Sequence, residues 1–281
     1  MIISGTVRET REQIKEWKKQ GLSVGLVPTM GYLHEGHQSL MEAAKQNNDR
    51  VAVSVFVNPI QFGPGEDFAS YPRDFEKDAA LCEKVGVDLI FHPEAEEMYD
   101  EDFCTYVDMD GLTKELCGKS RPTHFRGVQT VVSKLFHIIP ADRAYFGQKD
   151  AQQLAVIRRM VRDLDMDIQI VACPIIREAD GLAKSSRNTY LDEAERKAAL
   201  VLSRAVFHGE EMMRNGERNA DVILGAMREM IETEPLARID YVEMVDADTI
   251  EPLAEAEGRV LTAMAVYIGK TRLIDNFIME V

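Results

Sequence analysis

Short apolar segments alternate with longer amphipathic segments along the first 176 residues. The apolar segments are rich in Val, Ile and Phe and end at or beside Pro, Gly or Asn, as buried strands do. On this basis we predict five strands, over residues 23–29, 50–58, 87–93, 142–147 and 168–174.

Helical patterns fill the stretches between these strands. Thr6 and Glu9 have the spacing of a capping box, which predicts the start of the first helix. Further helices are predicted over residues 36–47, 74–85, 127–139 and 150–164. Strands that alternate with helices indicate a parallel sheet with helices on both of its faces.

The pattern changes after Pro174. Two long helical stretches, 192–215 and 219–232, precede two strand-like ones, 238–247 and 258–269. We therefore predict an α/β protein with a Rossmann-like, doubly wound domain over residues 1–176 and a smaller α+β C-terminal domain over residues 177–281. The segment that joins them, "READGLAKSSRN", is polar and contains glycine, so we expect a loop that walls a cleft.

Composition narrows the classes of function. The chain has 281 residues, of which 45% are apolar, and its 33 Lys and Arg against 48 Asp and Glu give a net charge of -15. This charge repels a nucleic-acid backbone, so we expect no nucleic-acid partner. Any anionic ligand must be held by a local cationic pocket.

Targeting signals and cysteine motifs are not apparent. No segment reaches the roughly 20 apolar residues of a membrane span, and the N-terminus lacks the apolar core of a signal peptide. We therefore expect a cytoplasmic protein without membrane contact. The four cysteines form no CxxC pair, so they predict neither a disulfide framework nor a zinc site.

Polar clusters follow four of the five predicted strands. They read "TMGYLHEGH", "NPIQFGPGEDF", "GQKDAQQ" and "DGLAKSSRN". The carboxyl ends of parallel strands meet at one edge of the sheet, where doubly wound folds bind their ligands. We therefore expect the four clusters to outline a single site.

His34 and His37 lie where the first predicted strand gives way to a helix, and three interpretations are open. As zinc ligands they are one residue too close for the H-E-x-x-H helix, and no third ligand is evident. As structural residues they would cap the helix that starts near Gly36. As phosphate ligands they would add two imidazole donors to the free N–H groups of a helix N-terminus. The strand–loop–helix setting favours phosphate binding.

Two further clusters supply cations and hydrogen-bond donors. Lys149 is placed to reach a polyphosphate, and Asp150 is placed to cap the following helix or to help to hold Mg2+. Residues 184–187, "KSSR", add two hydroxyls, two cations and successive backbone amides. No complete P-loop is present, and no G-x-G-x-x-G follows a strand. A nucleotide must therefore be bound by a different motif.

These motifs resemble those of a known family. "HEGH" is similar to the HxGH form of the HIGH signature of the nucleotidyltransferase superfamily, and "KSSRN" resembles its KMSKS-type second loop. Together with "FVNPIQF", "YPRD", "RPTHFRGV" and "FGQKDAQQ", they resemble the pantothenate synthetase family in order and spacing over nearly the full length. The resemblance implies that pantoate and β-alanine are joined using ATP and Mg2+ through an enzyme-bound pantoyl adenylate, releasing AMP and pyrophosphate. It also implies a cytoplasmic homodimer whose smaller domain closes over the active site.

The resemblance also implies roles for individual residues. The ATP site is implied to comprise Pro28, Thr29, Met30, His34, Gly36, His37, Gly147, Lys149, Asp150, Ile176, Lys184, Ser185, Ser186 and Arg187. Pantoate and β-alanine are implied to contact Met30, Asn58, Gln61 and Gln153. The implied catalytic residues are His34, His37, Lys149 and Arg187, with His37 as the proton donor. Asp150 is the candidate protein ligand to Mg2+, which we expect the ATP phosphates to hold for the most part.

Two residues depart from the family pattern. Thr123 stands where Gly is frequent, and Lys184 stands where Met or Leu is usual. We expect Lys149, on a short turn at a helix start, to be the electrostatic phosphate ligand. The ammonium group of Lys184 is expected to be free to swing into water.

Two alternatives share some of these features. A fragment of a class I aminoacyl-tRNA synthetase would carry both signatures, although this chain is acidic and has no room for a tRNA-binding module. A non-catalytic nucleotide sensor would bind ATP without releasing pyrophosphate.

Overall fold

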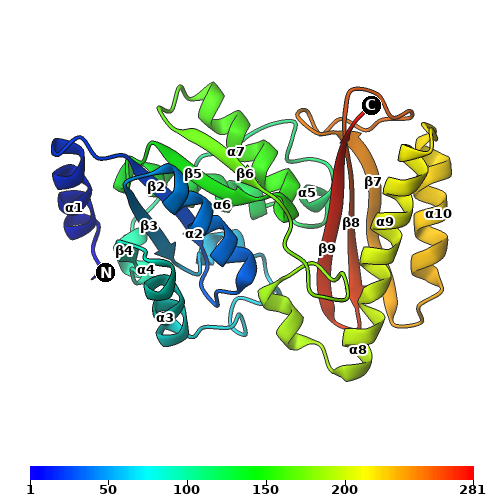
Figure 1. Cartoon of the computed structure of the whole chain (residues 1–281), viewed down its shortest axis with the longest axis horizontal. Coiled ribbons are helices and arrows are strands. Elements are labelled where there is room, and N and C mark those ends of the chain that lie inside the picture. Colours follow the sequence, from blue (N-terminus) through cyan, green and yellow to red (C-terminus); the bar gives the residue numbers. More distant parts are fainter. The chain divides into compact units, whose positions relative to one another are not determined.

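The computed structural model describes all 281 residues (Figure 1). Its internal contacts divide the chain into two compact units. The first unit contains residues 1–109, 123–148 and 156–174, and the second contains residues 110–122, 149–155 and 175–281. Two short segments from within residues 1–176 therefore group with the second unit. The domain limits 1–176 and 177–281 stay a prediction.

The first unit contains a six-stranded sheet in the order β1-β4-β3-β2-β5-β6, and every pairing in it is parallel. The strands are β1 (Ile2–Ser4), β2 (Val24–Thr29), β3 (Arg50–Val55), β4 (Leu89–Phe91), β5 (Arg143–Gly147) and β6 (Gln169–Cys173). The five predicted strands and the doubly wound class are confirmed. The sequence pattern missed β1 because three residues are too few to show an alternation.

The predicted helices are also present, within a few residues of their predicted ends. They are α1 (Val7–Lys19), α2 (Glu35–Asn47), α3 (Phe75–Val85), α6 (His124–Ile138) and α7 (Ala151–Asp163), with the short helices α4 (Ala95–Met98) and α5 (Cys117–Ser120) in addition. The predicted helix start is confirmed, because Thr6 Oγ1 accepts a hydrogen bond of 3.2 Å from the backbone N–H of Glu9. The second half of the capping box is not formed, because the Glu9 carboxylate accepts from Thr6 Oγ1 at 2.9 Å and the N–H of Thr6 donates to Ser4 Oγ at 3.4 Å. Helix α3 begins after Asp74, whose side chain caps it, and ends at Gly86, whose φ is +84°.

Helices cover both faces of this sheet. On one face, α2 and α3 contact each other, and Met41 and Cys82 from these helices pack on Val51, Val53 and Val55 of β3. Right-handed crossovers place α1 and α6, which contact each other, on the opposite face. The strand order reverses between the neighbouring strands β2 and β5. A doubly wound sheet binds its ligand at this switch point, beyond the carboxyl ends of the strands.

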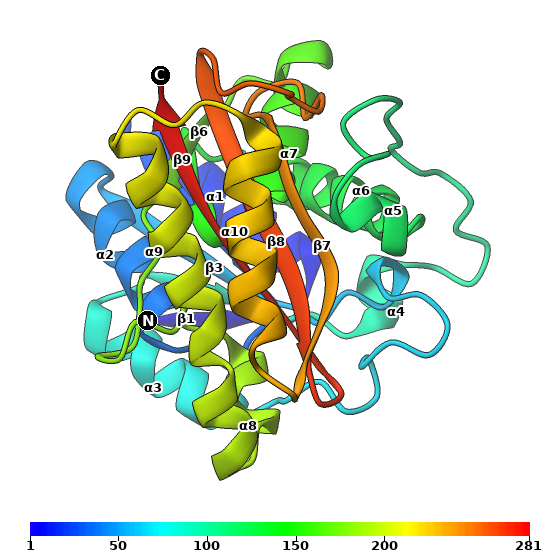
Figure 2. The same ribbon diagram turned by 90° about the vertical axis from the view of Figure 1, so that its right-hand side faces the viewer.

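The second unit contains a separate antiparallel sheet in the order β7-β8-β9. Its elements are β7 (Ala237–Asp246), β8 (Arg259–Ile268), β9 (Thr271–Glu280), α8 (Glu193–Ala198), α9 (Leu200–Arg214) and α10 (Ala220–Glu232). Helices α9 and α10 lie side by side on one face of this sheet (Figure 2). Their apolar side chains, including Val206, Ile223 and Met227, form its core with Met264 and Phe277.

Two sequence predictions for this unit need correction. The single helix predicted over 192–215 is two helices, because the chain tightens at Ala199, whose carbonyl accepts an i→i+3 hydrogen bond from Leu202. The third strand, β9, was not predicted. Asp275 and Asn276 interrupt its apolar pattern, yet both are buried. None of the helices combines the length and the apolar character needed to cross a bilayer.

Candidate active site

The turn between β2 and α2 is held in an unusual conformation. Gly31 has φ +79°, where a Cβ would lie 3.0 Å from a carboxylate oxygen of Asp78, and Tyr32 has φ +51°. Asp78 is 1% exposed and accepts hydrogen bonds from the backbone N–H groups of Tyr32 (2.8 Å) and Leu33 (2.6 Å). These two bonds compensate the left-handed backbone and fix the path of the chain up to His34.

Burial is the main influence on the Asp78 carboxyl group. It raises the pKa of Asp78, while the hydrogen bonds from Leu33 and Tyr32 act in the opposite direction. A carboxylate taken out of water in this way is stable only with such donors. Asp78 therefore acts as an internal anchor for the turn that leads into α2.

His34 and His37 form a reciprocal cap at the start of α2. His34 Nδ1 accepts from the N–H of Gly36 at 3.1 Å, and His37 Nδ1 accepts from the N–H of His34 at 3.3 Å. An accepting Nδ1 carries no proton in a neutral imidazole, so these hydrogen bonds assign the N–H to Nε2 in both rings. The ring centroids are 4.1 Å apart. The structural interpretation of the pair as a helix cap is thus confirmed, with both Nε2–H groups at the start of α2. A role of the two imidazoles towards phosphates stays a prediction.

The other residues at the end of β2 have local partners. Pro28 pairs in register with Ser54, and Thr29 Oγ1 donates to the Ser54 carbonyl at 2.6 Å and accepts from the N–H of Gly31 at 3.2 Å. Met30 Sδ lies 3.0 Å from Gln61 Nε2. The strand end is therefore rigid, and it brings Met30 of the predicted ATP segment next to Gln61 of the predicted acid site.

The turn after β3 carries the predicted contacts for pantoate. Asn58 precedes the 3-10 turn η1 (Pro59–Gln61), and the exposed fractions of Asn58 and Gln61 are 1% and 7%. Helix α6 packs on this turn at Gly127, where a Cβ would lie 2.4 Å from the carbonyl oxygen of Ile60. Only glycine permits this approach. The first unit thus holds two contacting groups, His34 with His37 and Met30 with Asn58 and Gln61. Gly147 ends β5, the neighbour of β2.

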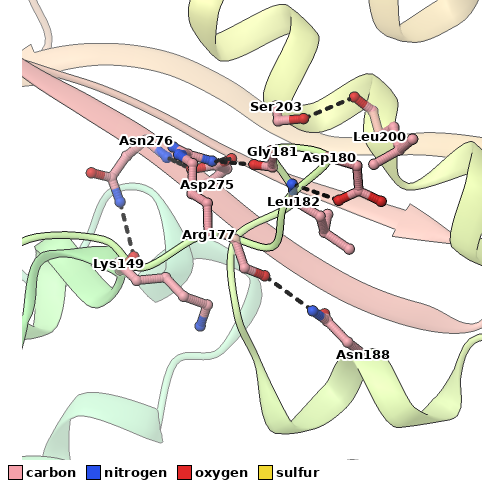
Figure 3. Close-up of polar contacts among 11 residues, drawn as sticks. Lys149, Arg177, Asp180, Gly181, Leu182, Asn188, Leu200, Ser203, Asp275 and Asn276 are labelled. Carbon is pink, nitrogen blue, oxygen red and sulfur yellow. Dashed lines mark hydrogen bonds and ion pairs between the residues drawn. The ribbon is translucent and has the colours of Figure 1, made fainter. Parts of the chain in front are cut away.

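The second unit holds the two cationic clusters. Lys149 and Asp150 lie in the 3-10 turn η2 (Gln148–Asp150) before α7. The Lys149 ammonium is 3.7 Å from the Asp150 carboxylate, and the Lys149 carbonyl accepts from Asn276 Nδ2 at 2.9 Å (Figure 3). Because Asn276 belongs to β9, the backbone that carries Lys149 is tied to the antiparallel sheet.

Residues 176–184 form a hairpin that leads into the "KSSRN" motif. The N–H of Lys184 donates to the carbonyl of Ile176 at 2.9 Å, and Arg177 pairs with Ala183. Asn188 Nδ2 donates to the Ala183 carbonyl at 3.1 Å. Ser185 caps the 3-10 turn η3 (Ser186–Tyr190) by accepting from the N–H of Arg187. The motif therefore has a defined backbone.

An ion pair anchors this hairpin to β9. The Arg177 guanidinium donates to both carboxylate oxygens of Asp275, at 2.7 and 2.9 Å, and to the carbonyl of Gly181 at 3.0 Å (Figure 3). Asp275 is 1% exposed, so the pair is bidentate and largely removed from water. Adjacent residues of one strand, Asp275 and Asn276, thus hold the hairpin and the Lys149 turn.

A hollow in the second unit lies between these anchors. It is lined by Lys149, Leu182, Ala183, Ser185, Asn188, Leu202, Leu273, Ile274 and Asp275. Lys149 and Ser185, which sequence analysis assigned to one phosphate site, therefore line the same hollow.

The expectation that the Lys184 ammonium is free in water is wrong. Lys184 Nζ is 3.0 Å from a carboxylate oxygen of Glu178, and its side chain is 17% exposed. Both residues belong to the hairpin, whose two strands bring the charges together. The positive charge of Lys184 is therefore already neutralised by a neighbour.

Neighbouring glutamines on α7 differ in their surroundings. Gln152 is buried and bonds to the N–H of Cys117 and to the carbonyls of Leu112 and Glu115, at 2.7 to 2.9 Å. It therefore holds the segment 110–122. Gln153 is half-buried and lies one residue further round the helix. The predicted contact of Gln153 with the acid stays a prediction.

No group of three or more His, Cys, Asp or Glu side chains is arranged to hold a metal ion. Asp150 is exposed, and its carboxylate lies 3.7 Å from the Lys149 ammonium. The predicted role of Asp150 towards Mg2+ stays a prediction.

Comparison with known proteins decides the family. The family model described as pantoate-beta-alanine ligase matches residues 2–278. The chain belongs to the pantoate-beta-alanine ligase family. This ligase is 62% identical over 272 residues to the pantothenate synthetase of Ruminiclostridium cellulolyticum, an alignment that covers 97% of this chain and 96% of the relative. It is 60% identical over 280 residues to that of Enterococcus faecalis, covering 100% and 99% of the two chains.

Solved structures agree with this assignment. The crystal structure of the Thermus thermophilus pantothenate synthetase superposes on the ligase with a TM-score of 0.94 at 47% identity and covers 99% of each chain. The pantoate-beta-alanine ligase of Francisella tularensis, described as complexed with β,γ ATP and β-alanine, has a TM-score of 0.81 at 33% identity. That match covers 99% of this chain and 97% of the relative. The resemblance to the pantothenate synthetase family is confirmed.

Sequence reasoning missed several residues that shape the site of this ligase. Asp78, Gly127, Asp275 and Asn276 were not predicted to matter. The spacing of Asp78 indicated that it is buried, because it lies four residues before buried Cys82 on the apolar side of α3. The other three gave none, because their partners are distant in the sequence.

Proposed function

We propose that this ligase forms pantothenate from pantoate and β-alanine through a pantoyl adenylate, with release of AMP and pyrophosphate. The observation that carries the mechanism is the reciprocal cap of His34 and His37, which assigns the N–H of both rings to Nε2 at the N-terminus of α2. Such an arrangement suits the phosphates of ATP, because the donors and the helix dipole both favour negative charge. His37 would donate its hydrogen bond to the oxygens on which charge develops as pantoate attacks the α-phosphate.

Residues of the two cationic clusters would also contact the ATP phosphates. Lys149 lines the same hollow as Ser185 and would supply the main positive charge to the phosphates. Arg187 and the hydroxyls of Ser185 and Ser186 would donate hydrogen bonds to phosphate oxygens. Gly147, Ile176 and the backbone of Lys184 would contact the nucleotide.

Mg2+ fits this site as a metal held mainly by the substrate. Mg2+ commonly binds through one or two carboxylates together with phosphate oxygens and water. The one candidate carboxylate, Asp150, adjoins Lys149, and no larger group of acidic or imidazole ligands is present. When bound, Mg2+ would neutralise charge on the phosphates.

The acid would be held by neutral amides. Gln61, with Met30 and Asn58 beside it, and Gln153 would orient pantoate by hydrogen bonds. An amide avoids the tight ion pair that would reduce the nucleophilicity of the attacking carboxylate. Correct orientation alone is a large part of the rate enhancement for such a transfer.

The two alternatives from sequence analysis are not favoured. The ligase family model matches residues 2–278, so the sequence is accounted for without a tRNA synthetase fragment. A sensor would need no acid site. By analogy with the family we further propose a cytoplasmic location and a homodimer.

Product analysis tests the proposed reaction. With ATP, Mg2+, pantoate and β-alanine, we expect one AMP and one pyrophosphate for each pantothenate formed, measured by ion-pair chromatography. A stoichiometric yield of ADP and phosphate would instead indicate an acyl phosphate and would refute the adenylate mechanism. ATP binding without any product would favour the sensor.

A further inference from the structure

Three polar side chains of the first unit form a chain of hydrogen bonds that ends at the proposed acid site. Tyr99 Oη is 2.7 Å from Asn58 Oδ1, and Asn58 Nδ2 is 3.0 Å from Gln61 Oε1. At the end of the chain, Gln61 Nε2 is 3.0 Å from Met30 Sδ. Asn58 and Gln61 are buried, so the direction of each amide has energetic consequences.

A backbone carbonyl determines the direction of the whole chain. Asn58 Nδ2 is also 3.1 Å from the carbonyl oxygen of Gly127, which can only accept. The NH2 group of Asn58 must therefore face Gly127, and its two hydrogens are used by the Gly127 carbonyl and Gln61 Oε1. Asn58 Oδ1 then faces Tyr99, whose hydroxyl must donate.

The same constraint determines the direction of Gln61. Because Gln61 Oε1 accepts from Asn58, the NH2 group of Gln61 points to the opposite side, towards Met30. Turning the Gln61 amide over would place its NH2 against the NH2 of Asn58. Burial raises the pKa of Tyr99 and so keeps its hydroxyl protonated as a donor.

We propose that Tyr99 and Asn58 are positioning residues that hold the Gln61 amide with its NH2 group towards the bound acid. Gln61 then selects a substrate oxygen that can accept, such as a carboxylate or hydroxyl oxygen of pantoate. Asn58 acts through Gln61, because both of its amide hydrogens are used within the protein. This inference rests on the proposed contact between Gln61 and pantoate.

A double-mutant cycle between Tyr99 and Gln61 tests the inference. Tyr99→Phe removes one hydroxyl, and we expect the KM for pantoate to rise about 5- to 10-fold while the KM for ATP stays within about 2-fold. In the Gln61→Ala background, Tyr99→Phe should have no further effect on the KM for pantoate, because the residue it acts through is gone. The control is Tyr267→Phe, which removes a hydroxyl from a half-buried residue of β8 in the second unit and should leave both constants unchanged.

Asn58→Asp provides a second variant of nearly the same shape. The ionised carboxylate cannot donate, so the Gln61 amide turns its NH2 towards it and presents Oε1 to the acid. The Gly127 carbonyl loses its donor in the same variant, which lowers stability. We expect the KM for pantoate to rise on the order of 100-fold, with a small change in the KM for ATP. Thermal unfolding of each variant, monitored by circular dichroism, identifies any general loss of structure.

The outcomes separate the inference from the proposed function. If Gln61→Ala raises the KM for pantoate but Tyr99→Phe adds its full effect in that background, the positioning role is refuted and the Gln61 contact stands. If Gln61→Ala leaves the KM for pantoate unchanged, the Gln61 contact itself is wrong, and the positioning role is refuted with it. A rise in both KM values for Tyr99→Phe would indicate a merely structural role.

Discussion

Replacing His37 with alanine is expected to lower kcat on the order of 100-fold or more, with a much smaller rise in the KM for ATP. The reason is that the Nε2–H of His37 would form its strongest hydrogen bond when charge develops on the phosphates. The hydrogen bond from the N–H of His34 to His37 Nδ1 assigns that proton to Nε2 and orients the ring. Steady-state kinetics at saturating pantoate and β-alanine measure both constants.

A second variant separates this role from helix capping. His37 occupies the N3 position of the cap, where glutamine is a usual capping-box residue. His37→Gln can therefore keep the cap, but it supplies no imidazole, so its kcat should remain low. His137→Ala, at the exposed end of α6, is the matched control and should keep full activity. Full recovery of kcat in His37→Gln would show that the pair serves only to start the helix.

Replacing Lys149 is expected to lower kcat/KM for ATP far more than replacing Lys184. Lys149→Ala should lower kcat/KM for ATP on the order of 100-fold, as expected for loss of a strong, preorganised charge contact. Lys184→Met should change it only a few-fold, because the Lys184 ammonium is already paired with Glu178 at 3.0 Å. The difference between the two lysines follows from their positions, because Lys149 lines the hollow of the second unit and Lys184 does not. Kinetics of the two variants at fixed Mg2+ measure the difference.

Glu178→Gln serves as the control for the lysine pair. It removes the negative charge opposite the Lys184 ammonium without changing the size of either side chain, so a large gain or loss of ATP affinity would show that this positive charge acts on the phosphates. A larger loss from Lys184→Met than from Lys149→Ala would mean that the hairpin carries the main phosphate charge. The assignment of that role to Lys149 would then be wrong.

Local signals were sufficient to predict most of the fold. The cap at Thr6 and the apolar strands with their terminal Pro, Gly or Asn depend on neighbours in the sequence, and these features are present. Strand β9 escaped prediction because Asp275 and Asn276 look like loop residues. They are buried only because Arg177 and the Lys149 carbonyl, about 100 residues or more away, provide partners.

Some residues of the candidate site were likewise predictable from local sequence signals, and others were not. His34 and His37 were recognisable from their spacing at a strand–helix junction, and the interpretation of the pair as a cap is confirmed. The positions of Asp78, Tyr99 and Gly127 relative to the site depend on tertiary contacts, which periodicity and motif spacing do not encode. The ion pair of Lys184 was missed for a related reason, since the hairpin that brings Glu178 to it is formed by the loop itself.

Exchange of labelled pyrophosphate into ATP detects adenylate formation separately from amide formation. We expect exchange with ATP, Mg2+ and pantoate alone, without β-alanine, and little exchange when another small carboxylic acid replaces pantoate. Exchange that requires β-alanine, or no exchange in an enzyme that still makes pantothenate, would contradict a separate pantoyl adenylate.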